Sequence, residues 1–166
     1  KTIKNKLSPK FLMIIPKGGF LNIHEIVAIL TSSIILSIVL TWCWTPDLTI
    51  FWEPFVIFLA IILLFMFIRE VLRALLSEKL KFHSKYYIWP IGAIMMFVST
   101  ALGNTFSLAA NHHYEEKDLK KCGKVSYIVS LVMFIIVAIS FFINLIYPST
   151  ILQMIIIVNI LNLFID

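Results

Sequence analysis

Charged side chains are scarce in this 166-residue chain. Aspartate, glutamate, lysine and arginine together make up 14% of the residues, whereas 60% are hydrophobic. Soluble globular proteins carry about 25% charged residues, so the composition excludes that class and indicates an integral membrane protein. Cysteine is rare as well, because Cys43 and Cys122 are the only two and form no Cys-x-x-Cys pair. Their placement excludes a disulfide framework and a zinc knuckle.

Acidic residues are fewer than basic ones, nine against 14, which gives a formal net charge of +5. In a membrane protein an excess of basic residues reports orientation and attraction to anionic headgroups. We therefore expect the lipid bilayer as a partner and no nucleic acid. The basic residues fall into three groups, five within residues 1–17, five within 69–85 and four within 117–124.

Four apolar stretches approach the length of about 20 residues that crosses a bilayer. We predict an all-α integral membrane protein with about four transmembrane helices. Its single membrane domain, residues 23–166, follows a basic tail at residues 1–22, which the positive-inside rule places in the cytoplasm. The predicted spans are residues 23–44, 53–68 with a continuation to 80, 125–147 and 150–166.

Residues 88–110 are apolar enough to cross a membrane but contain Pro90, Gly92 and Gly103. If this segment crossed, the lysines of residues 117–124 would face the opposite side from the other ten basic residues. The positive-inside rule places basic residues on one side. We therefore predict a re-entrant or extended insert with short β-structure between the second and third spans. Such backbone at membrane depth must be buried against protein or line a wet cavity.

The second apolar stretch runs directly into residues 69–73, which read Arg-Glu-Val-Leu-Arg, and then into residues 81–92, which are basic and aromatic and read as a strand and a turn. Arg69 and Arg73 share one helical face, and Glu70 is three residues from Arg73, so an ion pair is expected. Two interpretations are open. The three side chains form either a snorkelling collar on lipid headgroups or an internal charge cluster.

This order of helix, charged motif and basic-aromatic strand resembles the core of the site-2 protease family of intramembrane zinc metalloproteases, whose helix carries His-Glu-x-x-His. Glu70 stands at the position of the family's catalytic base, but Arg69 and Arg73 replace the two histidines. Arginine is permanently protonated and has no lone pair for a metal. The resemblance thus implies a retained scaffold without zinc ligands, with no metal cofactor and no functional catalytic residue.

The resemblance predicts a non-catalytic pseudoprotease that binds transmembrane segments or partner proteins through a lateral groove and a strand edge. Two alternatives remain open. One is an active intramembrane metalloprotease that uses Glu70 and zinc ligands beyond the end of the chain. The other is a small-solute or anion transporter in which Arg69 and Arg73 bind the anion. The chain reaches Asp166 before the segment that carries the family's third ligand, so we expect a longer protein.

Histidines form two further candidate groups. His24 and Glu25 give half of a zinc motif, which we interpret as the start of a helix capped by Asn22. The second group is His83, His112, His113 and Cys122, which could gather a metal at the cytoplasmic face. Adjacent histidines in a loop rich in glutamate and lysine are usually solvated, and that is our prediction for this group.

Overall fold

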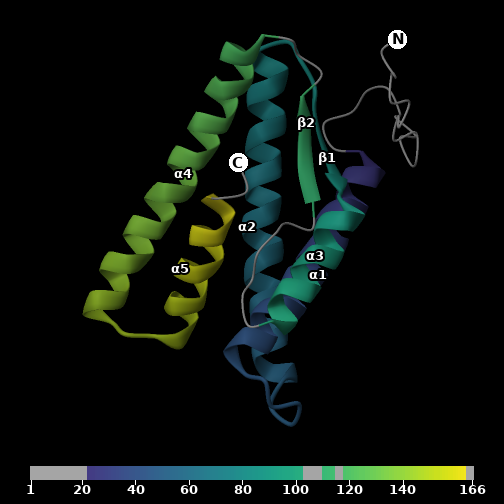
Figure 1. Cartoon of the computed structure of the whole chain (residues 1–166). Coiled ribbons are helices and arrows are strands. Elements are labelled where there is room, and N and C mark those ends of the chain that lie inside the picture. The colour runs from purple at the N-terminus through teal and green to yellow at the C-terminus, as the bar shows by residue number, and fades with distance from the viewer. Residues whose placement is uncertain (1–21, 103–109, 115–117, 164–166) are drawn as a thin grey trace.

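A computed structural model describes residues 22–102, 110–114 and 118–163 of the chain. Five helices and a small antiparallel sheet form one elongated molecule (Figure 1). In chain order the elements are α1 (Ile23–Trp44), α2 (Trp52–Lys79), β1 (Ser84–Ile88), α3 (Pro90–Ala101), β2 (Ala110–Tyr114), α4 (Leu119–Ile146) and α5 (Thr150–Leu163).

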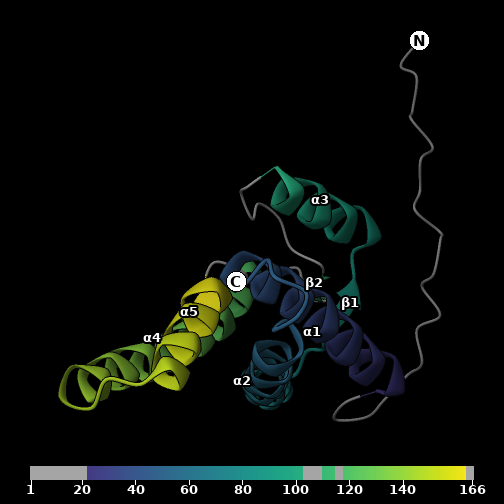
Figure 2. The same ribbon diagram turned by 90° about the horizontal axis from the view of Figure 1, so that it is seen from below.

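Helix α2 is the centre of the arrangement, because it packs against α1 on one side and against α4 and α5 on the other (Figures 1 and 2). The core between α1, α2 and α5 is apolar, and its most buried members include Val39, Phe58, Ile62, Met66 and Val158. Seen along the helices, α1 lies between α2 and α3 (Figure 2). The two strands lie beside the upper halves of α1 and α2 (Figure 1).

Three of the described helices, α1, α2 and α4, are long and apolar enough to cross a membrane. The predicted spans 23–44 and 53–80 match α1 and α2 closely. Helix α5 has 14 described residues, or about 21 Å at 1.5 Å per residue, which is shorter than a full span. The end of the predicted fourth span, residues 164–166, lies outside the described residues, as does the predicted tail up to residue 21.

The third predicted span, residues 125–147, coincides with the apolar part of α4, and the helix itself begins earlier. Helix α4 starts at Leu119 rather than at residue 125, because the Asp118 side chain caps it by accepting a hydrogen bond from the backbone N–H of Lys120 at 3.0 Å. Hydropathy marks only the apolar part of a helix, whereas the cap sets its real beginning. The hairpin predicted after Tyr147 is present, and the Asn144 side chain accepts a bond from the Ser149 N–H at 3.0 Å.

The short β-structure predicted between the second and third spans is confirmed as a two-stranded antiparallel sheet, whose register runs from Ser84 opposite Tyr114 to Ile88 opposite Ala110. This pairing returns the chain beside the point where it left α2. The predicted turn at residues 89–92 is wrong, because Pro90 begins α3; proline suits the first turn of a helix. Residues 103–109 of the predicted insert lie outside the described residues.

Helix α2 ends in a Schellman arrangement that aims the chain into β1. The Phe82 N–H bonds the Ser77 carbonyl and the Lys81 N–H bonds the Glu78 carbonyl, at 3.1 and 2.9 Å. Lys81 has a φ of 62°, the left-handed region that usually holds glycine at this position. Phe82 is buried, and its packing fixes the direction in which the strand leaves the helix.

The sheet pairing predicts which loops share one side of the membrane. Cysteines introduced by His83→Cys and Lys124→Cys should both react with an impermeant thiol reagent from one side, and Leu48→Cys only from the other. The native Cys43 and Cys122 are first replaced by serine and alanine. If the His83 and Lys124 positions label from opposite sides, the insert crosses the bilayer and the pairing is incorrect.

A buried charge cluster as the candidate functional site

The middle of the molecule contains two arginines and a glutamate that are shielded from the surface. Arg69 and Arg73 have 0% and 1% of their surface exposed, and Glu70 has 4%. All three belong to the last part of α2, and the four-residue spacing of the arginines puts them on one face. They do not extend outward as a collar at the interface would. The predicted cluster is therefore internal.

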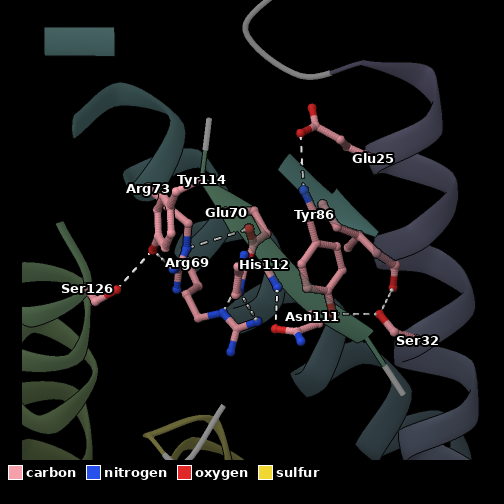
Figure 3. Close-up of polar contacts among 11 residues, drawn as sticks. Glu25, Ser32, Arg69, Glu70, Arg73, Tyr86, Asn111, His112, Tyr114 and Ser126 are labelled. Carbon is pink, nitrogen blue, oxygen red and sulfur yellow. Dashed lines mark hydrogen bonds and ion pairs between the residues drawn. The ribbon is translucent and has the colours of Figure 1, made fainter. Parts of the chain in front are cut away.

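Both arginines contact the Glu70 carboxylate. Arg69 Nε donates to Glu70 Oε1 at 3.0 Å, and Arg73 Nε lies 3.9 Å from Glu70 Oε2 (Figure 3). The ion pair expected between Glu70 and Arg73 is present, but the shorter contact is made by the neighbouring Arg69. Each carboxylate oxygen thus faces a guanidinium, and the attraction between the opposite charges offsets part of the desolvation of the three groups.

Strand β2 supplies the next layer of the site. His112 Nε2 lies 3.5 Å from Glu70 Oε1 and 3.4 Å from Arg69 Nη2. The prediction that His112 is solvated is wrong. Side chains alternate along a strand, so Ala110, His112 and Tyr114 turn inward while Asn111 and His113 are exposed.

Two tyrosines tie the sheet to the helices on either side. The Tyr114 hydroxyl accepts a hydrogen bond from Arg73 Nη1 and bonds Ser126 Oγ of α4 at 2.9 Å. The Tyr86 hydroxyl bonds Ser32 Oγ of α1 at 3.0 Å (Figure 3). Burial raises the pKa of Tyr86 to about 12, so its hydroxyl stays protonated. These bonds hold the sheet against the charge cluster.

Glu25 has a structural role that its half zinc motif did not indicate. Its Oε1 accepts a hydrogen bond from the Tyr86 backbone N–H at 3.3 Å, and its Oε2 accepts one from the Asn22 N–H at 2.9 Å. Asn22 is the N-cap of α1, as predicted. Glu25 therefore closes the start of α1 and also holds the outer edge of β1.

The residues that commonly bind metals do not form a metal site in the part of the chain that the structure describes. No three histidine, cysteine, aspartate or glutamate side chains come close enough to hold an ion there. His112 lies beside Glu70, whereas His83 and His113 are exposed and Cys122 is buried in α4. Sequence reasoning missed Tyr86, Tyr114 and His112 as members of the site.

Burial and the two neighbouring arginines together determine the protonation of His112. Burial first, and then the charges of Arg73 and Arg69, lower the pKa of His112 well below its usual value. Glu70 is the acidic neighbour among the described residues, and the Tyr86 ring lies 5.0 Å from the imidazole ring. The imidazole is therefore neutral at physiological pH and can donate to Glu70 or accept from Arg69, depending on its tautomer.

This protonation predicts the pH dependence of stability. In the unfolded chain His112 binds a proton near pH 6.5, whereas the folded protein resists it, so the unfolded state binds more protons below about pH 6.5. The free energy of unfolding should fall as the pH falls through that window, by up to about 1.4 kcal/mol per unit. Unfolding in detergent between about pH 5 and pH 8 measures the slope of the free energy of unfolding against pH.

His112→Asn should reduce this slope, and His113→Asn, at an exposed position on the same strand, should not. Equal slopes in both variants would contradict the assignment.

Comparison with protein-family models, with characterised proteins and with solved structures finds no match to this chain. The resemblance to site-2 proteases therefore stays a prediction from the sequence.

Proposed function

We propose that the chain is a catalytically silent membrane scaffold of the site-2 protease type, which binds extended segments of other membrane proteins. One observation carries this proposal, namely that both guanidiniums face the Glu70 carboxylate. In the resemblance, Arg69 and Arg73 take the positions of the family's two metal-binding histidines, and Glu70 takes the position of its catalytic base. The internal charge cluster would then hold the fold together where a metal ion does so in the active enzymes.

The contacts of Glu70 argue against catalysis. A general base must reach a substrate or a water molecule, but Glu70 is 4% exposed and both of its oxygens face guanidiniums. Two adjacent positive charges also repel a metal cation from the same space. Glu70 therefore serves as the counterion of Arg69 and Arg73.

Metal analysis of the purified protein separates this proposal from the protease alternative. We expect no stoichiometric zinc, because arginine cannot ligate a metal. About one zinc per chain would instead support an active enzyme with ligands outside the described residues.

The outer edge of β2 is the surface that we assign to partner binding. Antiparallel pairs alternate between hydrogen-bonded and non-bonded positions. Tyr86, opposite His112, directs its N–H away from β2 and onto Glu25, so the edge of β1 is covered. His112 correspondingly directs its N–H outward, where the Asn111 side chain accepts it at 2.7 Å (Figure 3). An added strand would take over this donor.

Variants of Asn111 test strand addition directly. Asn111→Ala removes the competing acceptor, so partner binding should increase about fivefold for a hydrogen bond of about 1 kcal/mol. Asn111→Asp keeps an acceptor at the same place and should show no increase. The readout is the yield of partner cross-linking from a photoreactive residue at His113 in native membranes. A yield no higher than from the lipid-facing Phe142 position would refute strand addition.

The remaining features concern the membrane. We assign the end of the molecule that carries the exposed lysines to the cytoplasmic side, with anionic headgroups as its lipid partners. These lysines flank the sheet and are Lys79, Lys81, Lys120 and Lys124. The N-terminus would lie on the same side, because α1 and α2 form an antiparallel pair. We further propose that α5 continues as the fourth span.

A further inference from the structure

The outer end of the Arg69 guanidinium has donors that the cluster does not use. Its Nε bonds Glu70 Oε1 at 3.0 Å, and its Nη2 lies 3.4 Å from His112 Nε2. Its Nη1 is fully buried and has no hydrogen-bond partner among the residues that the structure describes. Figure 3 shows the crowding of the other partners around Glu70 and His112. Arg69 itself is 0% exposed.

A buried charged donor without an acceptor is costly. The loss is at least about 1 to 3 kcal/mol for a polar group, and larger for a charged one. A protein interior therefore supplies a partner, an ordered water or an ion to such a group. Glu70 is already shared with Arg73, and the neutral His112 offers no negative charge. Among the described residues, the surroundings of Nη1 thus carry an excess of positive charge and are shielded from the surface.

We propose that Arg69 Nη1 binds a small monovalent anion, of which chloride is the reference case, at the position where the related proteases would hold a cation. The enclosure of Arg69 restricts the ligand to a small ion, and a single unused guanidinium nitrogen matches a single negative charge. We assign the anion to a free ion from solution rather than to a lipid phosphate, because Arg69 is 0% exposed. The inference does not depend on strand addition at β2.

The direct test is thermal unfolding of the delipidated protein in detergent. The buffer contains sodium gluconate, which is replaced stepwise by sodium chloride at constant ionic strength. A ligand that binds only the folded state raises the unfolding midpoint in a saturable way. We expect chloride to raise it by about 2 to 4 °C, the shift that corresponds to about 1 kcal/mol at this chain length. Bromide should do the same. In bromide-grown crystals its anomalous peak should lie beside Arg69 Nη1.

Variants separate this site from general salt effects. Arg69→Gln should abolish the chloride-dependent shift, and Arg69→Lys, which restores the charge, should recover part of it. Lys124→Gln removes an exposed charge and should leave the shift unchanged. If Arg69→Gln does not fold, the bromide peak in the unaltered protein decides the question.

Four results would overturn the proposal. The first is a midpoint that does not depend on the identity of the anion, which would assign the position to water. The second is an equal chloride shift in Arg69→Gln. The third is a midpoint raised by phosphatidylglycerol in gluconate but not by chloride, which would assign the charge to a lipid phosphate. A bromide peak only at surface lysines would also exclude the site.

Discussion

Glu70→Gln should lower the free energy of unfolding by about 3 to 5 kcal/mol, the cost of removing one partner from a buried ion pair. The substitution keeps the size of the side chain but leaves Arg69 and Arg73 without the carboxylate that both contact. Denaturant unfolding in detergent measures the change. Glu78→Gln, an exposed carboxylate on the same helix, is the matched control and should change stability by less than about 0.5 kcal/mol.

A double-mutant cycle shows whether the cluster acts as a unit. Arg73→Met combined with Glu70→Gln should recover part of the stability that either single change loses, with a coupling energy well above about 1 kcal/mol. Methionine retains much of the apolar volume of the arginine stem. Small, additive effects would instead describe two solvated side chains at an interface, which would remove the basis for an internal cluster.

The second large effect is the gain of a metal site. Arg69→His together with Arg73→His rebuilds the His-Glu-x-x-His sequence around Glu70. The added imidazoles would stand one helical turn apart, which suits zinc coordination. We expect His112, whose Nε2 now lies 3.4 Å from Arg69 Nη2, to supply a third nitrogen ligand. We expect about one zinc per chain and an affinity at least ~10-fold above that of the parent protein, measured by competition with a zinc-binding dye.

Two matched variants identify the ligands. Arg69→Gln with Arg73→Gln removes the same charges without adding ligands and should gain no affinity. Adding His112→Asn to the double-histidine variant should lower the zinc affinity by about 10-fold or more. Removal of a group that only supports the ligands already has an effect of about this size. A folded double-histidine variant with no gain would show that the two positions do not face a common space, and the likeness to site-2 proteases would lose its main support.

The long helices were predictable because an apolar stretch of about 20 residues has few other possible structures. The charged centre of the site was predictable for a similar reason, since Arg69, Glu70 and Arg73 are neighbours on one helix, where spacing alone fixes the geometry. Helix α3 was not, because Pro90 and Gly92 read equally well as a turn and as the first turn of a helix.

The residues of β2 that contact the charge cluster could not be predicted from local sequence patterns. His112 and Tyr114 contact α2 only because β2 pairs with β1 across a long insert. Ala110, His112 and Tyr114 alternate with exposed residues, as is typical of a strand. The sequence does not show this alternation, because the residues on both faces of β2 are mostly polar. Burial of a histidine depends on which elements cover it.

The distance in sequence between the arginines and their partners has a consequence for biosynthesis. Arg69 leaves the ribosome 43 residues before His112. At about 5 to 20 residues per second, the interval is about 2 to 9 s. During that time α2 has reached the membrane with its guanidiniums and Glu70, but without the sheet that covers them. The translocon or water at the interface must shelter the charges, and a chain arrested near Ala101 should be a substrate for membrane quality-control proteases.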